Sequence, residues 1–402
     1  MKYNFDEVID RRGSSSLKWD TVKDGVIPLW VADMDFPCLS ELREALAERA
    51  AHPFYGYHTR SPSYYQTLAS WYRVQYGLPL GEECFLSGPG VVLSLSLAVQ
   101  AFTRPGDGVL LFTPVYTPFY EVIRSNGRET VEVPLVLDEE GRFVFDTALL
   151  GKTLAEAKER GLSVPLAFFC SPHNPGGRVW DSADIAAFLD FAKRNGIITA
   201  ADEIHGDFVY PPGKFISAAS FAEHRDRVLV VSGANKSFNM GGIHVSHFVV
   251  RDEALRRTLE QVLRASARRD LDVFSELAVE TVYRSGPDWL GELRNYLWEN
   301  IKTAADFLNT EVPGLRAYIP QGGYLIWARA EGLIKRKNCS GDTELARRLE
   351  DEGRVKITQG SIYGKGGAGF VRINAASPRA LLMEGLERIK RWAAGPENSG
   401  TI

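Results

Sequence analysis

The sequence predicts an α/β protein with a mainly parallel sheet in a large domain and a smaller α+β domain. Between about residues 85 and 280, short apolar runs alternate with amphipathic helical segments. That alternation is typical of buried parallel strands covered by helices on both faces. After about residue 285, long charged helical segments surround short strands instead. A chain of 402 residues is long enough for two such domains.

Five apolar runs bounded by polar or turn residues are the predicted strands of the parallel sheet. They cover 108–112, 165–170, 196–201, 227–232 and 245–250. Helical segments fall between several of these runs, for example at 184–195. That helix is expected to end before Gly196, because glycine commonly follows the last residue of a helix.

The C-terminal part and the N-terminal segment have different patterns. Helices are expected at 289–309, 342–352 and 378–394, around strands at 323–327 and 370–374. The segment WVADMDFP near the N-terminus fits neither a long helix nor a clear strand, and we expect it to lie across the cleft between the domains. The predicted division is an N-terminal segment 1–45, a large domain 46–284, a small domain 285–394 and a frayed tail 395–402.

Composition disfavours several classes of function. The net charge of −4 is small for this length, which argues against a protein that binds the nucleic-acid backbone. The N-terminus has no apolar core of a secretory signal, and no apolar run reaches the length of a membrane span. The four cysteines are scattered without metal-site spacing, so we expect free thiols, no metal and a cytoplasmic location.

Three polar residues follow predicted strands and are therefore expected together at the carboxyl edge of the sheet, where open α/β sheets place ligands. Asn174 follows the run at 165–170, Asp202 ends the run at 196–201, and Lys236 follows the run at 227–232. Each has an ordinary alternative. Asn174 stands in an Asn-Pro-Gly-Gly turn, Asp202 could cap the next turn, and Lys236 could be a solvated surface charge.

A glycine-rich turn precedes the helical pattern that starts near residue 91. Backbone N–H groups of Gly90, Val91 and Val92 at that helix N-terminus would suit a phosphate group. The signal is weak by itself, because glycine-rich turns into helices are common. No P-loop and no dinucleotide-binding fingerprint competes with it.

Three further residues have functional and structural interpretations. Arg372 lies in a short apolar strand, where it would need a carboxylate, either from an amino-acid substrate or from an internal Asp or Glu. Tyr116 could stack on a planar ring or be a core aromatic. His205 could donate a hydrogen bond to a ligand oxygen or be a structural histidine.

Together these residues meet the requirements that pyridoxal 5′-phosphate (PLP) places on its protein. Lys236 would form the Schiff base, and Asp202 would keep the pyridine nitrogen protonated. The helix N-terminus would hold the phosphate, and Arg372 would bind the substrate carboxylate. A lysine desolvated beside other positive charge has a lowered pKa, so it can act as nucleophile and general base.

The chain resembles the MalY/PatB-type cystathionine β-lyases, which are cysteine-S-conjugate C–S lyases of the fold-type I PLP-dependent aminotransferase superfamily. The resemblance runs along nearly the whole chain and includes RRGSSSLKWD, PLWVADMDFP, YGYHTR, SPHNPGGRVW, ADEIHGDFVY, NKSFNMGG, GGYLIW and FVRINAASP. It implies an aspartate-aminotransferase-like fold, PLP as cofactor and a homodimer with shared active sites.

The resemblance also implies roles for individual residues. Lys236, Asp202 and Tyr57 form the catalytic set, and Tyr57 would reach the phosphate of the neighbouring subunit's cofactor. Arg372 and Asn174 would bind the substrate. The implied cofactor-binding residues are Gly90, Val91, Val92, Tyr116, Asn174, Asp202, His205, Ser232, Asn235, Lys236 and Tyr57.

Four places depart from related patterns, the last of them Ala328-Arg329-Ala330, where relatives often show an acidic residue just after the strand at 323–327. Gly176 stands where the usual turn has threonine, and Asn235 stands where serine or threonine commonly precedes the lysine. His244 stands where aminotransferases of this fold generally carry an arginine, eight residues after the lysine. The absence of that arginine is usual in the lyase family and weighs against a standard aminotransferase.

The expected reaction is therefore β-elimination of a cystathionine-like L-cysteine S-conjugate to a thiol, pyruvate and ammonia. One alternative is an aminotransferase, because the same carbanion can be reprotonated on the cofactor. Another is a different PLP reaction on a cysteine S-conjugate, such as decarboxylation with oxidative deamination. A PLP-sensing regulator is disfavoured, because the family pattern starts by about residue 11 and leaves no room for a DNA-binding domain.

Overall fold

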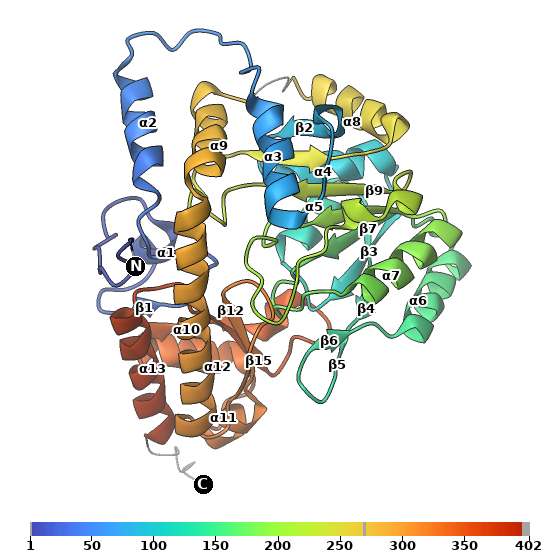
Figure 1. The fold of residues 1–402 in the computed structure, drawn as a ribbon. Helices are drawn as coiled ribbons and strands as arrows, with labels where there is room; N and C mark the ends of the chain where they lie inside the picture. Colours follow the sequence, from blue (N-terminus) through green and yellow to red (C-terminus); the bar gives the residue numbers. More distant parts are fainter. Residues whose placement is uncertain (1, 268–270, 396–402) are drawn as a thin grey trace.

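The structure is a computed structural model that describes residues 2–267 and 271–395, and two sheets organise it (Figure 1). The larger sheet has seven strands in the order β2-β10-β9-β8-β7-β3-β4. Its strands are β2 (Phe85–Gly88), β3 (Gly108–Thr113), β4 (Glu129–Pro134), β7 (Leu166–Cys170), β8 (Ile198–Asp202), β9 (Val228–Ser232) and β10 (Ser246–Val249). The five predicted strands of this region are all present, with ends shifted by a few residues at most.

One strand of the large sheet has a direction that differs from the predicted one. Strands β4, β3, β7, β8 and β9 are parallel, but β10 is antiparallel to both of its neighbours, β9 and β2. The prediction of a parallel strand at 245–250 was therefore wrong in direction. A parallel return requires a crossover, usually through a helix. The connection at 233–245 contains only turns, so the chain enters β10 from the edge at which it left β9.

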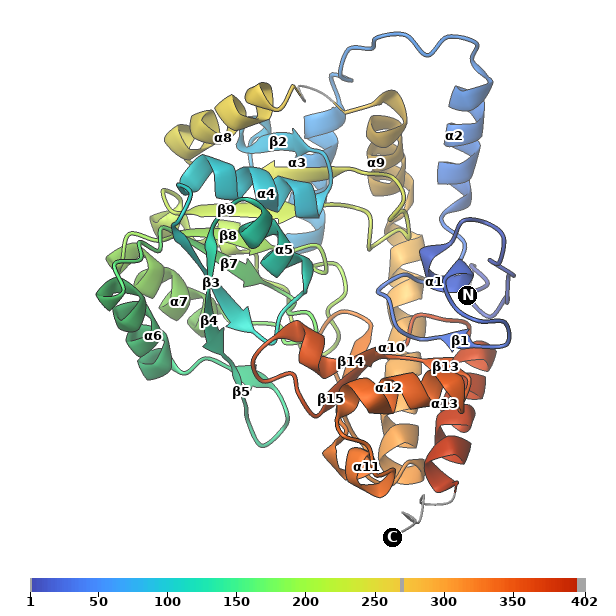
Figure 2. The same cartoon turned by 180° about the vertical axis from the view of Figure 1, so that it is seen from behind.

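Helices cover both faces of the large sheet (Figures 1 and 2). Along β3, Val109 and Leu111 pack in one apolar cluster, whereas Leu110 and Phe112 pack in the other. This alternation is the period of a strand that is buried on both faces. The helices are α3 (Tyr64–Tyr76), α4 (Val91–Phe102), α5 (Pro118–Ser125), α6 (Thr147–Glu159), α7 (Ser182–Arg194) and α8 (Glu253–Ala265), with the short hairpin β5 (Val136–Leu137) and β6 (Phe143–Val144) beside them.

The smaller sheet has four strands in the order β11-β12-β15-β14, all antiparallel. The predicted strand at 323–327 starts later, because Gly323 adopts a φ of +75° in the turn before it. Its strands are β11 (Arg316–Tyr318), β12 (Leu325–Arg329), β14 (Thr358–Gln359) and β15 (Phe370–Asn374), and the helices of this part are α10 (Pro287–Glu311), α11 (Glu331–Arg336), α12 (Asp342–Asp351) and α13 (Arg379–Ala394). Helix α9 (Val273–Ser285), which precedes them, packs against α3.

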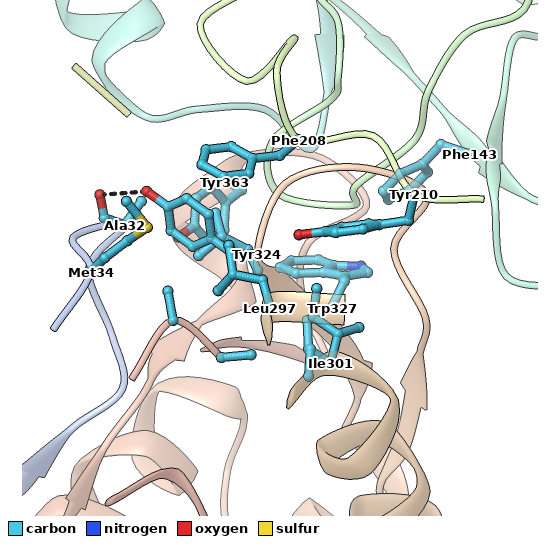
Figure 3. Close-up of a cluster of buried hydrophobic side chains, with 14 of the residues drawn as sticks. Ala32, Met34, Phe143, Phe208, Tyr210, Leu297, Ile301, Tyr324, Trp327 and Tyr363 are labelled. Carbon is cyan, nitrogen blue, oxygen red and sulfur yellow. Dashed lines mark hydrogen bonds between the residues drawn. The ribbon is translucent and has the colours of Figure 1, made fainter. Parts of the chain in front are cut away.

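An aromatic cluster fixes the smaller sheet against the loop that follows β8 (Figure 3). The ring of Tyr324 meets the ring of Phe208 edge to face, with centroids 5.3 Å apart. Tyr324 is fully buried and donates a hydrogen bond from its hydroxyl to the Ala32 carbonyl at 3.3 Å. Edge-to-face aromatic pairs add to the stability of their contact beyond the area that they bury. The cluster therefore ties the N-terminal segment to both sheets.

The N-terminal segment has little regular structure of its own. It contains α1 (Leu17–Asp20) and β1 (Ile27–Pro28), which pairs with β13 (Val355–Lys356), and it leads into α2 (Ser40–Ala51). As expected, the stretch WVADMDFP at 30–37 forms neither helix nor strand. Of the predicted tail 395–402, residues 396–402 lie outside the described residues. No helix among the described residues is long and apolar enough to cross a membrane.

Candidate active site

A cavity of about 630 Å³ lies at the carboxyl ends of β7 and β8, beside the N-terminus of α4. That volume is within the range of small-molecule sites. The WVADMDFP stretch and β15 close it from the side of the smaller sheet. Ten predicted site residues line it, namely Gly90, Val91, Val92, Tyr116, Asn174, Asp202, His205, Asn235, Lys236 and Arg372.

Lys236 reaches into this cavity from the loop after β9. Its Nζ donates a hydrogen bond to the Ala32 carbonyl at 2.6 Å. Burial lowers the pKa of Lys236, and the charge of Arg372 acts in the same direction, while Asp33 and Asp202 oppose it. A lowered pKa increases the fraction of free amine, which is the form that attacks a carbonyl or takes a proton.

Asp202 ends β8 and is only 3% exposed. Burial raises the pKa of Asp202 to about 7, although the Ile204 N–H, which donates to Oδ1 at 3.1 Å, and the charge of Lys236 lower it. A buried carboxylate is costly unless a cation accompanies it. Asp202 therefore fits a ligand that brings a protonated nitrogen to the floor of the cavity.

Arg372 binds neutral oxygens in the structure. Its Nη1 donates to Asn174 Oδ1 at 2.9 Å, and its Nη2 donates to the Trp30 carbonyl at 2.8 Å. Its Nε is buried with no hydrogen-bond partner. The alternative of an internal ion pair with Asp or Glu is not found for Arg372 within residues 2–267 and 271–395. A buried guanidinium without a carboxylate fits an anionic substrate group.

Two uncharged aromatic side chains, those of His205 and Tyr116, also line the cavity. His205 is buried with its Nδ1 unpartnered, and burial lowers the pKa of His205 to about 3, with the charges of Lys236 and Arg372 acting in the same direction. Burial raises the pKa of Tyr116 to about 12, so the phenol stays neutral. Both groups can donate or accept hydrogen bonds without adding charge.

The N-terminus of α4 offers donors for an anion, but fewer than the sequence predicted. Gly90 has a φ of +107° and directly precedes the helix, which has no side-chain cap. Val91 and Val92 lie in its first turn, where N–H groups have no acceptor within the helix. The Gly90 N–H donates to Ser246 Oγ at 3.1 Å, so it is already used. The donors that remain for a phosphate are those of Val91 and Val92.

Two predicted residues, Ser232 and Tyr57, lie outside the cavity lining, and Asn235 lines it but is bonded within its own loop. Ser232 is outside the cavity lining, and its hydroxyl donates to the Glu203 carbonyl at 3.2 Å. The Asn235 amide donates to the carbonyls of Ile243 at 2.5 Å and Met240 at 3.3 Å, so it braces its own loop. Tyr57 is fully exposed in the connection between α2 and α3 and does not line the cavity of its own chain.

Two carbonyl groups at the site carry no signal in the sequence, one from Ala32, which lines the cavity, and one from Trp30, which accepts from Arg372. Trp30 and Ala32 contribute backbone carbonyls, which depend on the path of the chain and not on residue type. Cys170 lines the cavity, and its Sγ receives a contact from the Asn174 N–H at 3.5 Å. His244, already singled out as a departure from aminotransferases, also lines the cavity.

The geometry of the site fits PLP, and comparison with known proteins gives the family. The family described as aminotransferase class I and II matches residues 24–389. The chain belongs to this family. It is 36% identical to cystathionine beta-lyase PatB of Bacillus subtilis over 395 residues, which are 96% of this chain and 99% of the relative. It is 31% identical to protein MalY of Escherichia coli, over 96% of this chain and 97% of the relative.

A solved structure gives the same result for the fold. The PLP-bound C–S lyase from Staphylococcus hominis has a TM-score of 0.90 to this chain at 29% identity, covering 98% of this chain and 99% of the relative. The predicted membership of the MalY/PatB group and the predicted fold-type I architecture are therefore confirmed.

Proposed function

We propose that this protein is a PLP-dependent C–S β-lyase that converts a cystathionine-like L-cysteine S-conjugate to a thiol, pyruvate and ammonia. One observation carries the proposal: a desolvated Lys236 shares a cavity with the buried Asp202 and with Arg372, whose charge has no carboxylate partner among the described residues. The names of the relatives, cystathionine beta-lyase and C–S lyase, support it.

The residues that would hold the cofactor divide by the part that they bind. Lys236 Nζ would hold PLP covalently, and Val91 and Val92 would donate their N–H groups to its phosphate. When bound, PLP withdraws electron density from the substrate Cα and so stabilises negative charge there. Asp202 would face the pyridine nitrogen and keep it protonated, because a proton shared there removes the cost of the buried carboxylate. His205 and Asn174 would contact the ring oxygen, and Tyr116 would cover the ring.

Arg372 and Lys236, the two basic side chains of the cavity, would bind the substrate and transfer its proton. Arg372 would bind the α-carboxylate through the guanidinium edge that now meets Asn174 and Trp30. Lys236, displaced by the substrate amine, would take the Cα proton at Nζ. The Cβ–S bond then breaks, and its electron pair leaves with the thiolate. The remaining three-carbon fragment is hydrolysed to pyruvate and ammonia, and Lys236 passes its proton to the thiolate.

Transamination would start with the same removal of the Cα proton and differ only in where the proton returns. His244 favours elimination, since it lines the cavity at the position where aminotransferases carry an arginine. The proposal is tested with L-cystathionine, by measuring pyruvate and free thiol. Equal amounts of the two are expected. A new amino acid formed in stoichiometric amount from an added keto acid, without thiol, would identify an aminotransferase.

The role of Lys236 is tested by Lys236→Ala, with Lys214→Ala, a change of an exposed loop lysine, as the control. Lys236→Ala is expected to lose both turnover and the visible absorbance of covalently held PLP. Lys214→Ala is expected to keep both. A Lys236→Ala protein that keeps its absorbance and its turnover contradicts the assignment.

We also propose a homodimer in which Tyr57 acts in the partner's cavity. The connection between α2 and α3 presents Phe54, Tyr55 and Tyr57 at 73%, 62% and 111% exposure. Exposed aromatic clusters of this kind are typical of contact surfaces. Glu276 and Glu280 of α9 hold the end of this connection through Ser61 and Ser63, so it leaves the chain in a fixed direction.

Subunit mixing tests the shared site. Lys236→Ala and Tyr57→Ala proteins are each expected to be impaired, and mixed dimers would contain one site with both native residues. Activity should therefore return when the two proteins are unfolded and refolded together. If Tyr57 acts in its own subunit, the mixture stays as inactive as its components.

The proposal also includes the organisation of the chain. Residues 1–45 would close the cleft, 46–284 would form the cofactor-binding domain and 285–394 the small domain. A cytoplasmic location is supported by the four cysteines, which are free thiols at positions 38, 84, 170 and 339.

A further inference from the structure

The WVADMDFP stretch contacts both cations of the cavity through its backbone. The Ala32 carbonyl accepts from Lys236 Nζ at 2.6 Å, and the Trp30 carbonyl accepts from Arg372 Nη2 at 2.8 Å. Val31 and Ala32 line the cavity directly. The residue that follows, Asp33, carries a carboxylate one peptide away from the oxygen that holds Lys236.

Asp33 is fixed from several sides. Its Oδ2 accepts from Arg11 Nη2 at 2.7 Å. Its carbonyl accepts from Lys18 Nζ and from Asn374 Nδ2, each at 2.8 Å, and its N–H donates to the Val31 carbonyl at 2.9 Å. The side chain is 31% exposed, so it is neither buried in the core nor free in solvent. These contacts hold the Asp33 charge at a constant place beside the cavity.

Several titratable groups face Lys236 from different elements. Asp33 is the charged group with the largest influence on Lys236 and raises its pKa, whereas Arg372 lowers it and Asp202 raises it. The titratable or charged groups around the amine are Asp33, Asp202, His205, Arg372, Tyr116, Tyr324 and His244. Burial keeps His205 neutral, and Tyr116 and Tyr324 stay protonated because burial raises their pKa values.

The proposed function changes this balance when the site is filled. The charge of Asp202 would be matched by the ring nitrogen, and that of Arg372 by the substrate carboxylate. Of these three protein charges, that of Asp33 would then be the one matched by neither the cofactor nor the substrate. Removal of the Cα proton breaks the C–H bond and forms an N–H bond at Nζ, which turns a neutral amine into an ammonium. A negative charge nearby favours that product.

We propose that Asp33 is a positioning residue for the proton-accepting amine: its carboxylate, held by Arg11, stabilises Lys236 Nζ as an ammonium against the Ala32 carbonyl. The inference rests on the proposed function for its role in turnover. The electrostatic link itself needs no cofactor. Arg11 also contributes to this arrangement, because it neutralises part of the Asp33 charge and pairs with Asp35 Oδ1 at 2.9 Å.

The test measures the reactivity of Lys236 in the apoenzyme. Trace labelling with acetic anhydride at a series of pH values, read by mass spectrometry of the Lys236 peptide, gives the midpoint at which the amine becomes reactive. Asp33→Asn removes the charge but keeps the size, and should move this midpoint to lower pH by about one unit. Arg11→Gln leaves the Asp33 charge unmatched, and should move it to higher pH.

The opposite directions separate electrostatics from loosening. Both changes remove the Arg11–Asp33 ion pair, and Arg11→Gln also removes the pair with Asp35, so a purely structural effect of the loosened segment would move the midpoint the same way in both. Asp33→Glu keeps the charge and should restore most of the native midpoint. Asp24→Asn is the matched control, because it removes a carboxylate of the same segment that is fully exposed. It should leave the midpoint unchanged.

Two outcomes overturn the proposal: shifts in the same direction for Asp33→Asn and Arg11→Gln, or no shift with Asp33→Asn in a protein whose circular dichroism is native. The holoenzyme then provides the link to turnover. Asp33→Asn should lower kcat and leave KM almost unchanged, because the change does not affect the binding of substrate. Because the labelling uses neither PLP nor substrate, its result stands apart from the lyase assignment, which would fail separately if no thiol were formed.

Discussion

The two sides of the cavity are built in different ways. On the side of the large sheet, strand ends present side chains, with Asp202 at the end of β8 and Lys236 in the loop after β9. On the other side, the WVADMDFP stretch presents backbone carbonyls to Lys236 and Arg372. The difference teaches that residue types identify the first side, whereas only the fold of the N-terminal segment creates the second.

The carbonyl side depends on a buried carboxylate, Asp35. It accepts hydrogen bonds from Lys18 Nζ at 2.7 Å, Trp19 Nε1 at 2.8 Å and Ser377 Oγ at 2.7 Å, besides its pair with Arg11. Burial by itself would raise the pKa of Asp35, but Lys18 and these donors hold it below its ordinary value. A fully partnered buried carboxylate keeps a short irregular segment in one conformation.

The largest predicted effect concerns Lys236, on the side of the cavity that the large sheet forms. Lys236→Arg keeps a positive charge beside the Ala32 carbonyl but removes the proton acceptor, because arginine stays protonated. Turnover should fall at least about 10²–10⁴-fold, the usual contribution of a positioned acid–base group. The same change at the exposed Lys214 is the control. A Lys236→Arg enzyme with near-native kcat would show that the proton acceptor lies elsewhere.

The next largest predicted effect concerns the carbonyl side of the cavity, which the WVADMDFP stretch forms. Lys18→Met removes the buried partner of Asp35 and should lower the free energy of unfolding by about 3–5 kcal/mol. Lys23→Met is the control, since Lys23 is 67% exposed in its pair with Asp351 and such a pair contributes about 1 kcal/mol or less. Urea unfolding measures both. Equal losses in the two variants would mean that the Asp35 network does not fix the segment.

The third prediction uses the raised pKa of Asp202 in the apoenzyme. The folded protein keeps this carboxyl protonated up to about pH 7, whereas the unfolded chain loses the proton near the ordinary aspartate pKa of 3.8. At this carboxyl the unfolded state therefore binds fewer protons between these values, so the contribution of Asp202 to stability falls as the pH rises. Asp202→Asn should reduce this fall by on the order of a few kcal/mol. Glu203, whose pKa is raised to about 8 by burial, should contribute a fall of similar size that remains in the Asp202→Asn protein.

Bound PLP should act on the same dependence. A protonated nitrogen beside Asp202 stabilises the carboxylate, so saturating PLP should remove the Asp202 part of the pH dependence between pH 4 and 7. Thermal unfolding of apo and loaded protein across that range measures the difference. An Asp202→Asn apoenzyme with the same pH dependence of stability as the native apoenzyme would contradict the burial of a protonated Asp202.

The smallest predicted effect concerns the turn before α4. Gly90 has a φ of +107°, so Gly90→Ala forces an L side chain into a rare conformation at a cost of about 1–3 kcal/mol. The Kd for PLP should rise, because the first turn of α4 loses its alignment. Gly151→Ala in α6 is the control, since Gly151 has no neighbour within 4 Å of an added Cβ. That control should be neutral or stabilising.

Much of the fold followed from local patterns. The strands at 108–112 and 227–232 were predicted because a fully buried strand is a short, continuous apolar run with turn residues at both ends. The direction of β10 was not predictable in this way, because residues 245–250 have the same apolar composition in either direction. Its neighbours and the helix-free connection before it decide that direction.

The site divides in the same manner. Asp202, Lys236, Asn174 and Arg372 stood out in the sequence because charged or amide side chains next to apolar strands need a partner. Ser232 was also predicted to bind the cofactor, but its hydroxyl is bonded to the Glu203 carbonyl. Nothing in the local sequence distinguishes a serine that faces the cavity from one that faces the neighbouring strand end.

By itself, then, the sequence determined the periodicity of its strands and helices and the kinds of charged groups placed at strand ends. The tertiary structure decided which oxygens those charges meet: the Ala32 carbonyl for Lys236, the Trp30 carbonyl for Arg372 and the Ser246 hydroxyl for the Gly90 N–H. The physical reason is that every residue carries the same backbone donors and acceptors. Their selection depends on contacts between segments more than 150 residues apart in the chain.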